Sequence, residues 1–411
     1  MLDKKRFFTD FENLVNRLKF RGITHEELLS IKEKLIKQKG LEKKINELRQ
    51  ETNKLSQYGP QNAEKVKEIK EKIKQTEAEL DLLTTESNQS TNQLPNLPAL
   101  ETPTNEEGNK IIDNSEYQHA IQHNLSHEKI LRKLQMIDED KSILLSGSKF
   151  AVYQGFGSEL LHILINFMRV ENKQRGYRLF DTPYLVQAHN LYNTGQFHKF
   201  QDNLYKLEGN DFYLLPTAEV SLVNLYQNQI LAEDDLPLNL CAYSPCFRAE
   251  RMAAGQENKG LIRLHQFHKV ELVKIVPPEQ SYSELKKLLA DARHLLHLLQ
   301  IPHRVIELCH SELGFTAAKT YDIEVWLPVS QKWLEISSCS NCEDFQSRRS
   351  QIRVKKEGKK YYPHTLNGSA LAVDRLIITL CEYYYNEKEN KLIIPPVLEK
   401  YFYTSISSKL H

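Results

Sequence analysis

The sequence has little of what marks several specialised classes of protein. Glycine and proline number 15 each in 411 residues, which is too few for a collagenous or low-complexity chain. The six cysteines are sparse and lie only in the C-terminal half, so we expect a reduced, cytoplasmic protein without structural disulfides. Lys+Arg 55 against Asp+Glu 54 gives a formal net charge of +1, and any nucleic-acid partner must therefore be bound by a local patch of charge.

Long apolar runs are also absent. The longest, around 160–168, is interrupted by His162 and Asn166, and the first residues lead directly into charged sequence. Neither a membrane span nor a signal peptide is predicted. A hydrophobic fraction of 40% and a charged fraction of 27% are ordinary for a globular chain, and the length is enough for two or three domains.

The stretch between about residues 27 and 90 has a helical period. Lys and Glu dominate it, Trp and Phe are absent, and apolar residues recur at steps of three and four, which is the pattern of a coiled coil. Tyr58, Gly59 and Pro60 interrupt it midway, as a C-cap glycine followed by proline does between two helices. We therefore predict an antiparallel helical hairpin.

A linker and a second domain follow the hairpin. Residues 87–109 are rich in Ser, Thr, Asn and Pro and have no period, which predicts a linker. From about residue 115 onward, short β-like runs alternate with helical windows and hold most of the aromatic residues. This is an α+β pattern, and we expect an N-terminal domain over 1–100 and a C-terminal domain over 101–411.

The most informative stretch, 244–271, has the pattern strand, polar loop, strand. The period of two along each strand brings five side chains to one sheet face, namely Arg248, Glu250, Arg263, Phe267 and Glu271. Guanidinium groups bind phosphate, a ring stacks on a base, and a carboxylate accepts from an exocyclic amine, so the set suits a nucleotide. The alternative is a solvated face with cross-strand ion pairs, and spacing alone leaves both open.

Five further segments accompany this stretch in a fixed order. They are Arg175 to Val186, Leu215-Pro-Thr-Ala-Glu219, Gly314 to Trp326, Leu334 to Gln346, and His364 to Arg375. Together with the helical hairpin and a Pro-Asn-Leu-Pro linker, the six segments resemble the motifs of seryl-tRNA synthetases, which are class II aminoacyl-tRNA synthetases. Motif 1 would lie at about 157–185, motif 2 at 244–271 and motif 3 at 364–381, so the resemblance covers essentially the whole chain.

The resemblance implies both a fold and a reaction. The fold is α+β, with an N-terminal antiparallel α-helical coiled-coil arm that binds tRNA (about 27–90) and a catalytic domain in which an antiparallel β-sheet is flanked by helices. The reaction is that of a serine–tRNA ligase: L-serine and ATP give seryl-adenylate, and serine then passes to the 3′-end of the serine tRNA. The family also allows the selenocysteine tRNA as an acceptor, and it implies a homodimer without a membrane partner.

The ATP site follows from the same resemblance. Arg248 would clamp the α-phosphate and the serine carboxylate, and Arg375 would hold the γ-phosphate; these two are the expected catalytic residues. Glu335 and Ser338 would hold Mg²⁺ with ATP, since hard oxygen ligands suit that ion. The full set of expected ATP-binding residues is Arg248, Ala249, Glu250, Leu264, Phe267, Glu335, Ile336, Ser337, Ser338 and Arg375.

The serine site must recognise an ammonium, a carboxylate and a small hydroxyl. The resemblance places Thr217 and Glu219 at the ammonium, and Glu271 and Ser369 at the hydroxyl. The full set of expected serine-binding residues is Thr217, Ala218, Glu219, Arg248, Glu271, Asn367 and Ser369. A site that hydrogen-bonds a substrate hydroxyl rejects the analogue without it by on the order of 10⁴ or more.

Other interpretations remain at this level. Cys339 and Cys342 have the spacing of a zinc-binding pair, but they fall inside a segment that the family explains without metal. Arm lysines and arginines, which usually just line a solvated helix face, would supply a phosphate-binding patch. Two other functions compete with tRNA ligation: an adenylating homologue that loads a carrier protein, and a non-catalytic RNA-binding relative.

Three segments depart from the family pattern. Arg251-Met252-Ala253 stands where a small Ala-Gly-Ser step is usual, Ala370 and Asp374 stand where glycine or other small residues are common, and Glu312 replaces an aspartate. None of these changes removes a residue that the proposed chemistry needs.

Overall fold

A computed structural model describes residues 1–57, 59, 62–119, 121, 123–197, 201–250 and 260–406. It contains two compact units, Met1–Pro98 and Ala99–His411. Of the predicted turn at Tyr58, Gly59 and Pro60, only Gly59 lies within the described residues. Among the described residues, no helix is both long and apolar enough to cross a membrane.

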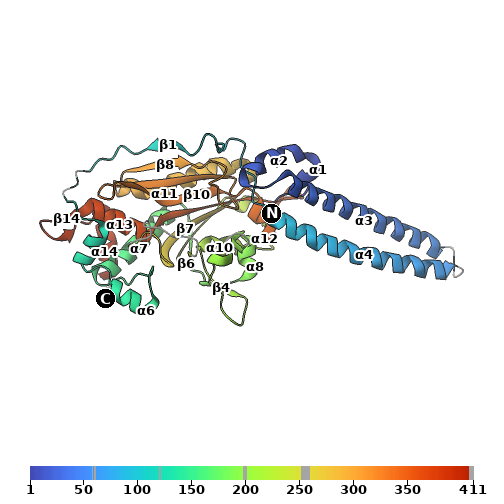
Figure 1. Ribbon diagram of the computed structural model, residues 1–411, viewed down its shortest axis with the longest axis horizontal. Helices are drawn as coiled ribbons and strands as arrows, with labels where there is room; N and C mark the ends of the chain where they lie inside the picture. The colour runs from blue at the N-terminus through green and yellow to red at the C-terminus, as the bar shows by residue number, and fades with distance from the viewer. Residues whose placement is uncertain are drawn as a thin grey trace. The chain divides into compact units, whose positions relative to one another are not determined.

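The first unit is helical and confirms the predicted hairpin. Short helices α1 (Arg6–Thr9) and α2 (Phe11–Leu18) precede the long helices α3 (His25–Gln57) and α4 (Ala63–Asn92), which run antiparallel (Figure 1). Thr24 and Glu27 start α3 with a capping box: each side chain accepts a bond from the other residue's backbone N–H, at 3.2 and 2.8 Å. The periodic apolar residues are buried along the seam, as the pattern predicts: Leu28, Ile31, Leu35, Leu41, Ile45, Ile69 and Leu83.

The linker prediction is wrong at its start, because 87–92 is the last part of α4. Ser87 and Thr91 turn their hydroxyls back to helix carbonyls, at 3.1 Å from Thr84 and 2.8 Å from Ser87. Both residues are fully buried. Their polar side chains therefore find hydrogen-bond partners within the helix. For this reason a composition rich in Ser and Thr did not end the helix, as the linker prediction assumed.

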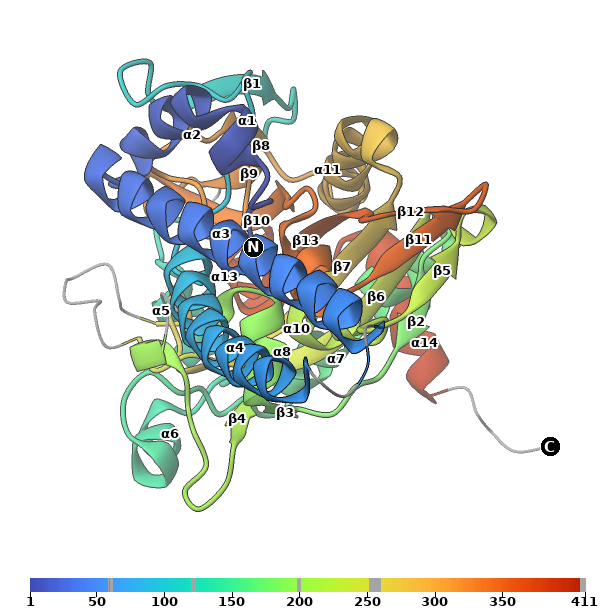
Figure 2. The ribbon, with the colours of Figure 1, turned by 90° about the vertical axis from the view of Figure 1, so that its right-hand side faces the viewer.

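The second unit confirms the expected sheet. Within the described residues its largest sheet has eight strands in the order β1-β8-β9-β10-β13-β7-β6-β2, and all neighbours are antiparallel except β2 and β6. Figure 2 shows β13, β7 and β6 side by side. The strands are β1 Lys110–Asn114, β2 Arg178–Phe180, β6 Leu238–Phe247, β7 Gln266–Val276, β8 His303–Glu307, β9 Lys319–Leu327, β10 Lys332–Asn341 and β13 His364–Ala372.

Helices pack on this sheet and close the core. The larger apolar cluster joins the sheet to α7 (Phe156–Gln174), α11 (Ser281–Leu298) and α13 (Val373–Tyr384), while a smaller cluster includes α8 (Ala188–Asn193) and α10 (Ala218–Asn224). Further helices among the described residues are α5 His127–Lys133, α6 Glu139–Ser146, α12 Phe345–Ser350 and α14 Pro396–Ile406. A three-stranded sheet has the order β12 (Lys359–Tyr361), β11 (Arg353–Lys356), β5 (Ile230–Ala232). Two small sheets pair β3 (Leu185–Gln187) with β4 (Phe212–Leu214) and β14 (Tyr385–Asn386) with β15 (Lys391–Leu392).

The six cysteines are free thiols, and all are buried. Cys339 and Cys342 lie at the end of β10 and in the turn after it, inside the packed core. Within the described residues no group of three or more His, Cys, Asp or Glu side chains is arranged to hold a metal ion.

Substitution of alanine for glycine should change the free energy of unfolding in opposite directions at two positions. A Cβ on Gly157, at the start of α7, would stand 2.1 Å from the backbone oxygen of Met136, whereas a Cβ on Gly40, in the middle of α3, meets nothing within 4 Å. We expect Gly157→Ala to lower the free energy of unfolding by about 1–3 kcal/mol through overpacking. Gly40→Ala should raise it by about 0.5–1 kcal/mol, because alanine has the better helix propensity.

Differential scanning calorimetry of the two variants measures both effects. Equal shifts in the same direction would contradict the close approach of α7 to the Met136 backbone.

Candidate active site

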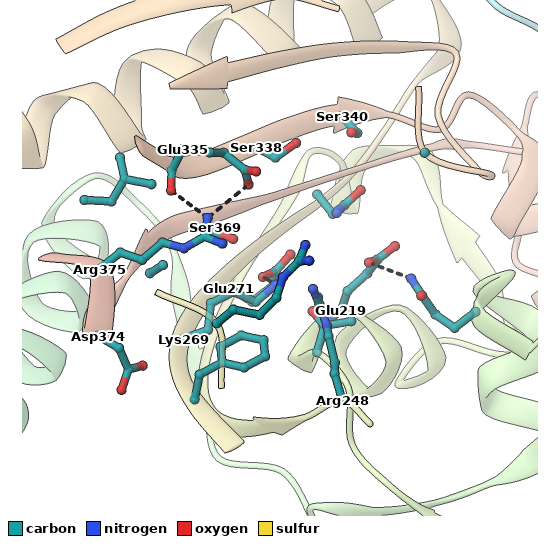
Figure 3. Close-up of a pocket in the computed structure, with 18 of the residues that line it drawn as sticks. Glu219, Arg248, Lys269, Glu271, Glu335, Ser338, Ser340, Ser369, Asp374 and Arg375 are labelled. Atoms are coloured by element: carbon teal, nitrogen blue, oxygen red, sulfur yellow. Dashed lines mark hydrogen bonds and ion pairs between the residues drawn. The ribbon is translucent and has the colours of Figure 1, made fainter. Parts of the chain in front are cut away.

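A cavity of about 390 Å³ opens on one face of the large sheet and collects most of the predicted site residues. Its walls come from β7, β10 and β13, from the first turns of α10 and α13, and from the chain just after β6 and just before β7 (Figure 3). The predicted residues that line it are Thr217, Glu219, Arg248, Glu250, Leu264, Phe267, Glu271, Glu335, Ile336, Ser338, Asn367, Ser369 and Arg375.

Three predicted residues do not line the cavity. Ala218 is the first residue of α10 and is fully buried. Ala249 is 9% exposed, and its backbone N–H donates to the Asn203 carbonyl. The Ser337 side chain turns behind the sheet face and donates to the carbonyl of Ser369 at 2.5 Å. These three support the walls instead of contacting the cavity.

A β-bulge explains how Glu335 and Ser338 come to share a face. At a spacing of three, a regular strand would point them to opposite sides of the sheet. The register of β10 against β9 shifts between Glu335 and Ser337, and the extra residue brings both side chains into the cavity.

The strands around motif 2 are shorter than the spacing predicts. β6 ends at Phe247 and β7 begins at Gln266, so Arg248, Glu250 and Arg263 are not on strands, and that part of the prediction is wrong. Past Phe247 the Arg248 backbone N–H still donates to the His265 carbonyl at 2.9 Å, but the Ala249 N–H donates to the Asn203 carbonyl, in the segment 201–203. Glu250 then takes a left-handed φ of 45°.

The side chains expected to share a face nevertheless line one cavity. The Arg248 guanidinium lies 5.1 Å from the Phe267 ring centre, a cation–π distance. Glu250 pairs with Arg263 at 3.4 Å. The connection 251–259, which contains Arg251, Met252 and Ala253, lies outside the described residues.

One end of the cavity is acidic and deeply buried. Thr217 caps α10 by accepting from the Glu219 backbone N–H at 3.3 Å, and the Glu219 side chain is only 4% exposed. Burial, and then the nearby charge of Glu271, raise the pKa of Glu219 to about 7. A buried carboxylate pair of this kind favours a cationic ligand.

Lys269 is a cavity residue that the sequence analysis missed. Its ammonium pairs with Glu271 at 2.5 Å, and both are nearly buried. The signal was present, because Phe267, Lys269 and Glu271 alternate on β7 and must share a face.

The opposite end of the cavity combines a guanidinium with carboxylates. Arg375, in the first turn of α13, donates to the Glu335 carbonyl at 2.6 Å and lies 3.8 Å from its carboxylate. Asp322 faces Ser338 across the β9–β10 ladder. Burial first, and then the charge of Glu335, raise the pKa of Asp322 to about 7.

Asp374, which the sequence analysis treated only as a departure, proves to be a structural anchor. Its buried carboxylate accepts from the backbone N–H of His268 at 2.6 Å and from the Tyr153 hydroxyl at 2.5 Å. The β13–β7 ladder ends one pair earlier, at Ala372 and Lys269. The Asp374 side chain therefore continues the hydrogen bonding to β7 beyond the end of the ladder. It fixes the neighbouring Arg375 relative to the strand that carries Phe267. Of the other departures, Ala370 and Glu312 are described and do not line the cavity: Ala370 is in the core, and Glu312 is in an exposed turn.

Known proteins match the chain in both sequence and fold. The tRNA synthetase class II core domain (G, H, P, S and T) matches residues 199–384. A serine–tRNA ligase from Hydrogenobaculum sp. (strain Y04AAS1) is 52% identical over 266 residues, which are 64% of this chain and 63% of that protein. Another from Sulfurihydrogenibium sp. (strain YO3AOP1) is 49% identical over 313 residues, 75% of each chain.

A solved structure extends the match to almost the full length. The crystal structure of seryl-tRNA synthetase from Pyrococcus horikoshii, complexed with ATP, aligns with a TM-score of 0.90 and 32% identity and covers 98% of both chains. The resemblance inferred from the motifs is thus confirmed, and the chain belongs to the seryl-tRNA synthetases, class II aminoacyl-tRNA synthetases that are ATP-dependent ligases.

Proposed function

We propose that this chain activates L-serine with ATP to seryl-adenylate and transfers serine to the 3′-end of serine tRNA. The observation that carries the proposal is the charge pattern of the cavity. Buried Glu219 and Glu271 lie at one end, Arg375 and Glu335 lie at the other, and Arg248 stands between them on the Phe267 ring. A ligand with an ammonium at one end and a polyphosphate at the other fits this pattern.

The amino acid would bind at the acidic end. Thr217 and Glu219 would hold its ammonium, while Glu271 and Ser369 would bond its hydroxyl and Asn367 would line the pocket. The ion pair with Lys269 orients the carboxylate of Glu271. Glu271 is only 1% exposed. An amino acid without a hydroxyl would leave these groups without a hydrogen-bonding partner, which favours serine over alanine.

ATP would bind across Phe267. The ring would stack on adenine, Glu250 would accept from the adenine amine, and Arg375 would hold the γ-phosphate. Leu264 and Ile336 supply apolar wall beside these groups. Arg248 would contact both the serine carboxylate and the α-phosphate, so it would offset the negative charge that develops as the carboxylate attacks phosphorus. Catalysis would then rest on positioning and charge stabilisation.

Magnesium fits the oxygen donors at Glu335 and Ser338. The two side chains share a face, and Glu335 is about half exposed at 49%. Burial, and then the charge of Glu335, raise the pKa of the neighbouring Asp322 to about 7. These are the hard ligands and the electrostatic setting that a divalent cation favours. When bound, the ion would neutralise phosphate charge during adenylate formation.

The helical arm would bind the tRNA. Several arm cations are already paired with acidic side chains across the hairpin, such as Lys37 with Glu79 at 2.9 Å and Arg49 with Glu77 at 2.7 Å. Lys67, Lys70 and Lys74 share one exposed face of α4. We therefore assign phosphate contacts to this face of α4. The selenocysteine tRNA is included as a second acceptor.

A homodimer is part of the proposal. The segment that resembles motif 1 leaves Tyr184 41% and Leu185 43% exposed beside an exposed Pro183. Apolar side chains at the surface in this segment are consistent with a subunit interface.

Serine-dependent exchange of pyrophosphate into ATP tests the activation step. We expect exchange with serine, little with alanine, and a loss on the order of 10²–10³ in rate for Arg248→Ala, the size seen when one charge-stabilising donor is removed. Arg49→Ala, on the arm, is the matched control and should keep the exchange rate.

The outcomes separate the competing functions. Exchange followed by charging of serine tRNA supports the ligase, and exchange without charging of any tRNA supports the carrier-protein homologue. A folded, ATP-binding protein without exchange would contradict the proposed activation of serine. It would favour the alternative function, a non-catalytic RNA-binding relative.

Glu335→Gln tests the proposed metal ligand. Removing one negative oxygen should raise the Mg²⁺ concentration needed for half-maximal exchange by about tenfold, since charge count tunes affinity for hard cations. Glu208→Gln, at an exposed position outside the cavity, is the control. An unchanged Mg²⁺ requirement in Glu335→Gln would remove this residue from the metal site.

A triple substitution Lys67→Ala, Lys70→Ala, Lys74→Ala tests the arm. It should raise KM for tRNA and lower the slope of log K against log salt by about 0.7–0.9 per lost phosphate contact, while pyrophosphate exchange stays unchanged. The double variant Lys37→Ala, Arg49→Ala removes cations that already have partners and should affect tRNA binding less. Equal effects in the two variants would contradict the assignment to the α4 face.

A further inference from the structure

The carboxylate of Glu219 accepts hydrogen bonds from two amide side chains. Gln346, on α12, donates from Nε2 to Glu219 Oε1 at 2.6 Å, and Gln196 donates to Oε2 at 3.4 Å. Gln346 is completely buried and does not line the cavity, so it acts on the cavity only through Glu219.

The amide of Gln346 can take only one orientation. Its Nε2 faces the carboxylate of Glu219 and the backbone carbonyl of Thr194, at 2.6 and 3.3 Å. The carbonyl and the ionised carboxylate both only accept. The Oε1 of Gln346 accepts from the hydroxyl of Thr365, on β13, at 2.7 Å. Turning the amide over would set oxygen against two acceptors, so the hydroxyl of Thr365 completes a network that makes Gln346 a donor toward Glu219.

The electrostatics around Glu219 make this donor important. Burial and the Glu271 carboxylate on β7 both favour the neutral acid and raise the pKa of Glu219 to about 7. The hydrogen bond from Gln346 acts in the other direction, together with the charges of Lys269 on β7 and Arg248 after β6. Near neutral pH the protonation of Glu219 is therefore finely balanced, and loss of one donor shifts it.

We propose that Thr365 and Gln346 form a relay that keeps the Glu219 carboxylate ionised and oriented to receive the ammonium group of the amino acid. The inference rests on the function proposed above, and it makes Gln346 and Thr365 positioning residues that never touch the substrate. Protonated Glu219 presents a neutral acid to the ammonium, so the relay sets the pH range in which serine binds.

Thr365→Val and Thr365→Ser form a matched pair for the test. Valine keeps the shape of threonine but removes the hydroxyl donor, whereas serine keeps the donor. Pyrophosphate exchange is measured for wild type and both variants from about pH 6 to 9, with separate KM values for serine and ATP. Thermal melts establish that each variant is folded.

We expect Thr365→Val to raise KM for serine about fivefold at pH 7 and toward tenfold at lower pH, as a rise of about one unit in the pKa of Glu219 requires. The pKa of Glu219 rises when the donor is lost, so KM for serine should approach that of wild type as the pH increases. KM for ATP should not change, and Thr365→Ser should follow wild type. Gln346→Met, which keeps the length but removes the donor, should show the same shift and replaces Thr365→Val if that variant does not fold.

A pH-independent loss in Thr365→Val and Gln346→Met would mean that the two residues only pack α12 against its neighbours, and it would overturn the inference. Unchanged kinetics in both variants would overturn it as well. Failure of the wild-type protein to exchange with serine at any pH is a different result, because it contradicts the proposed function rather than the relay.

Discussion

The register of strand β7 is the constraint on which the cavity depends. β7 lies between β6 and β13 and is bonded to both along nearly its whole length. Val270 and Leu272 point into the helix-covered core, while Lys269 and Glu271 point into the cavity. A slip of one residue would bury the charged set in the core and expose the apolar one, so packing of the core and chemistry of the cavity fix the same register.

Departures from regular strand geometry on the neighbouring strands then determine where the other cavity side chains lie. A bulge in β10 brings Glu335 and Ser338 together, and a second bulge in β13 follows Ser369. Where the β13 ladder ends, the carboxylate of Asp374 continues it by accepting from the His268 backbone N–H at 2.6 Å. This one side chain couples the start of α13, and with it Arg375, to the strand that presents Phe267. The positions of the two ends of the cavity are therefore fixed relative to each other through β7.

Much of this arrangement follows from sequence, and the limits have physical causes. The hairpin is set by a local period, and the motif order places Arg248, Glu271 and Arg375 in one site. The end of β6 could not be read from residue spacing, because it depends on a contact with Asn203, which is remote in sequence. Gln346 is the last residue of a motif, and its role appears only where α12 packs against α10. The composition around Ser87 predicts a linker, although the Ser87 hydroxyl donates to a carbonyl within a helix.

The central claim is that one cavity takes both serine and ATP in a single continuous arrangement. Competition with a non-hydrolysable seryl-adenylate analogue, such as seryl-sulfamoyl adenosine, tests it most directly by titration calorimetry on the full chain. The account predicts that the analogue displaces serine and ATP together and that Arg248→Ala weakens it more than it weakens either substrate alone. Displacement of ATP with serine binding left intact would contradict a shared cavity.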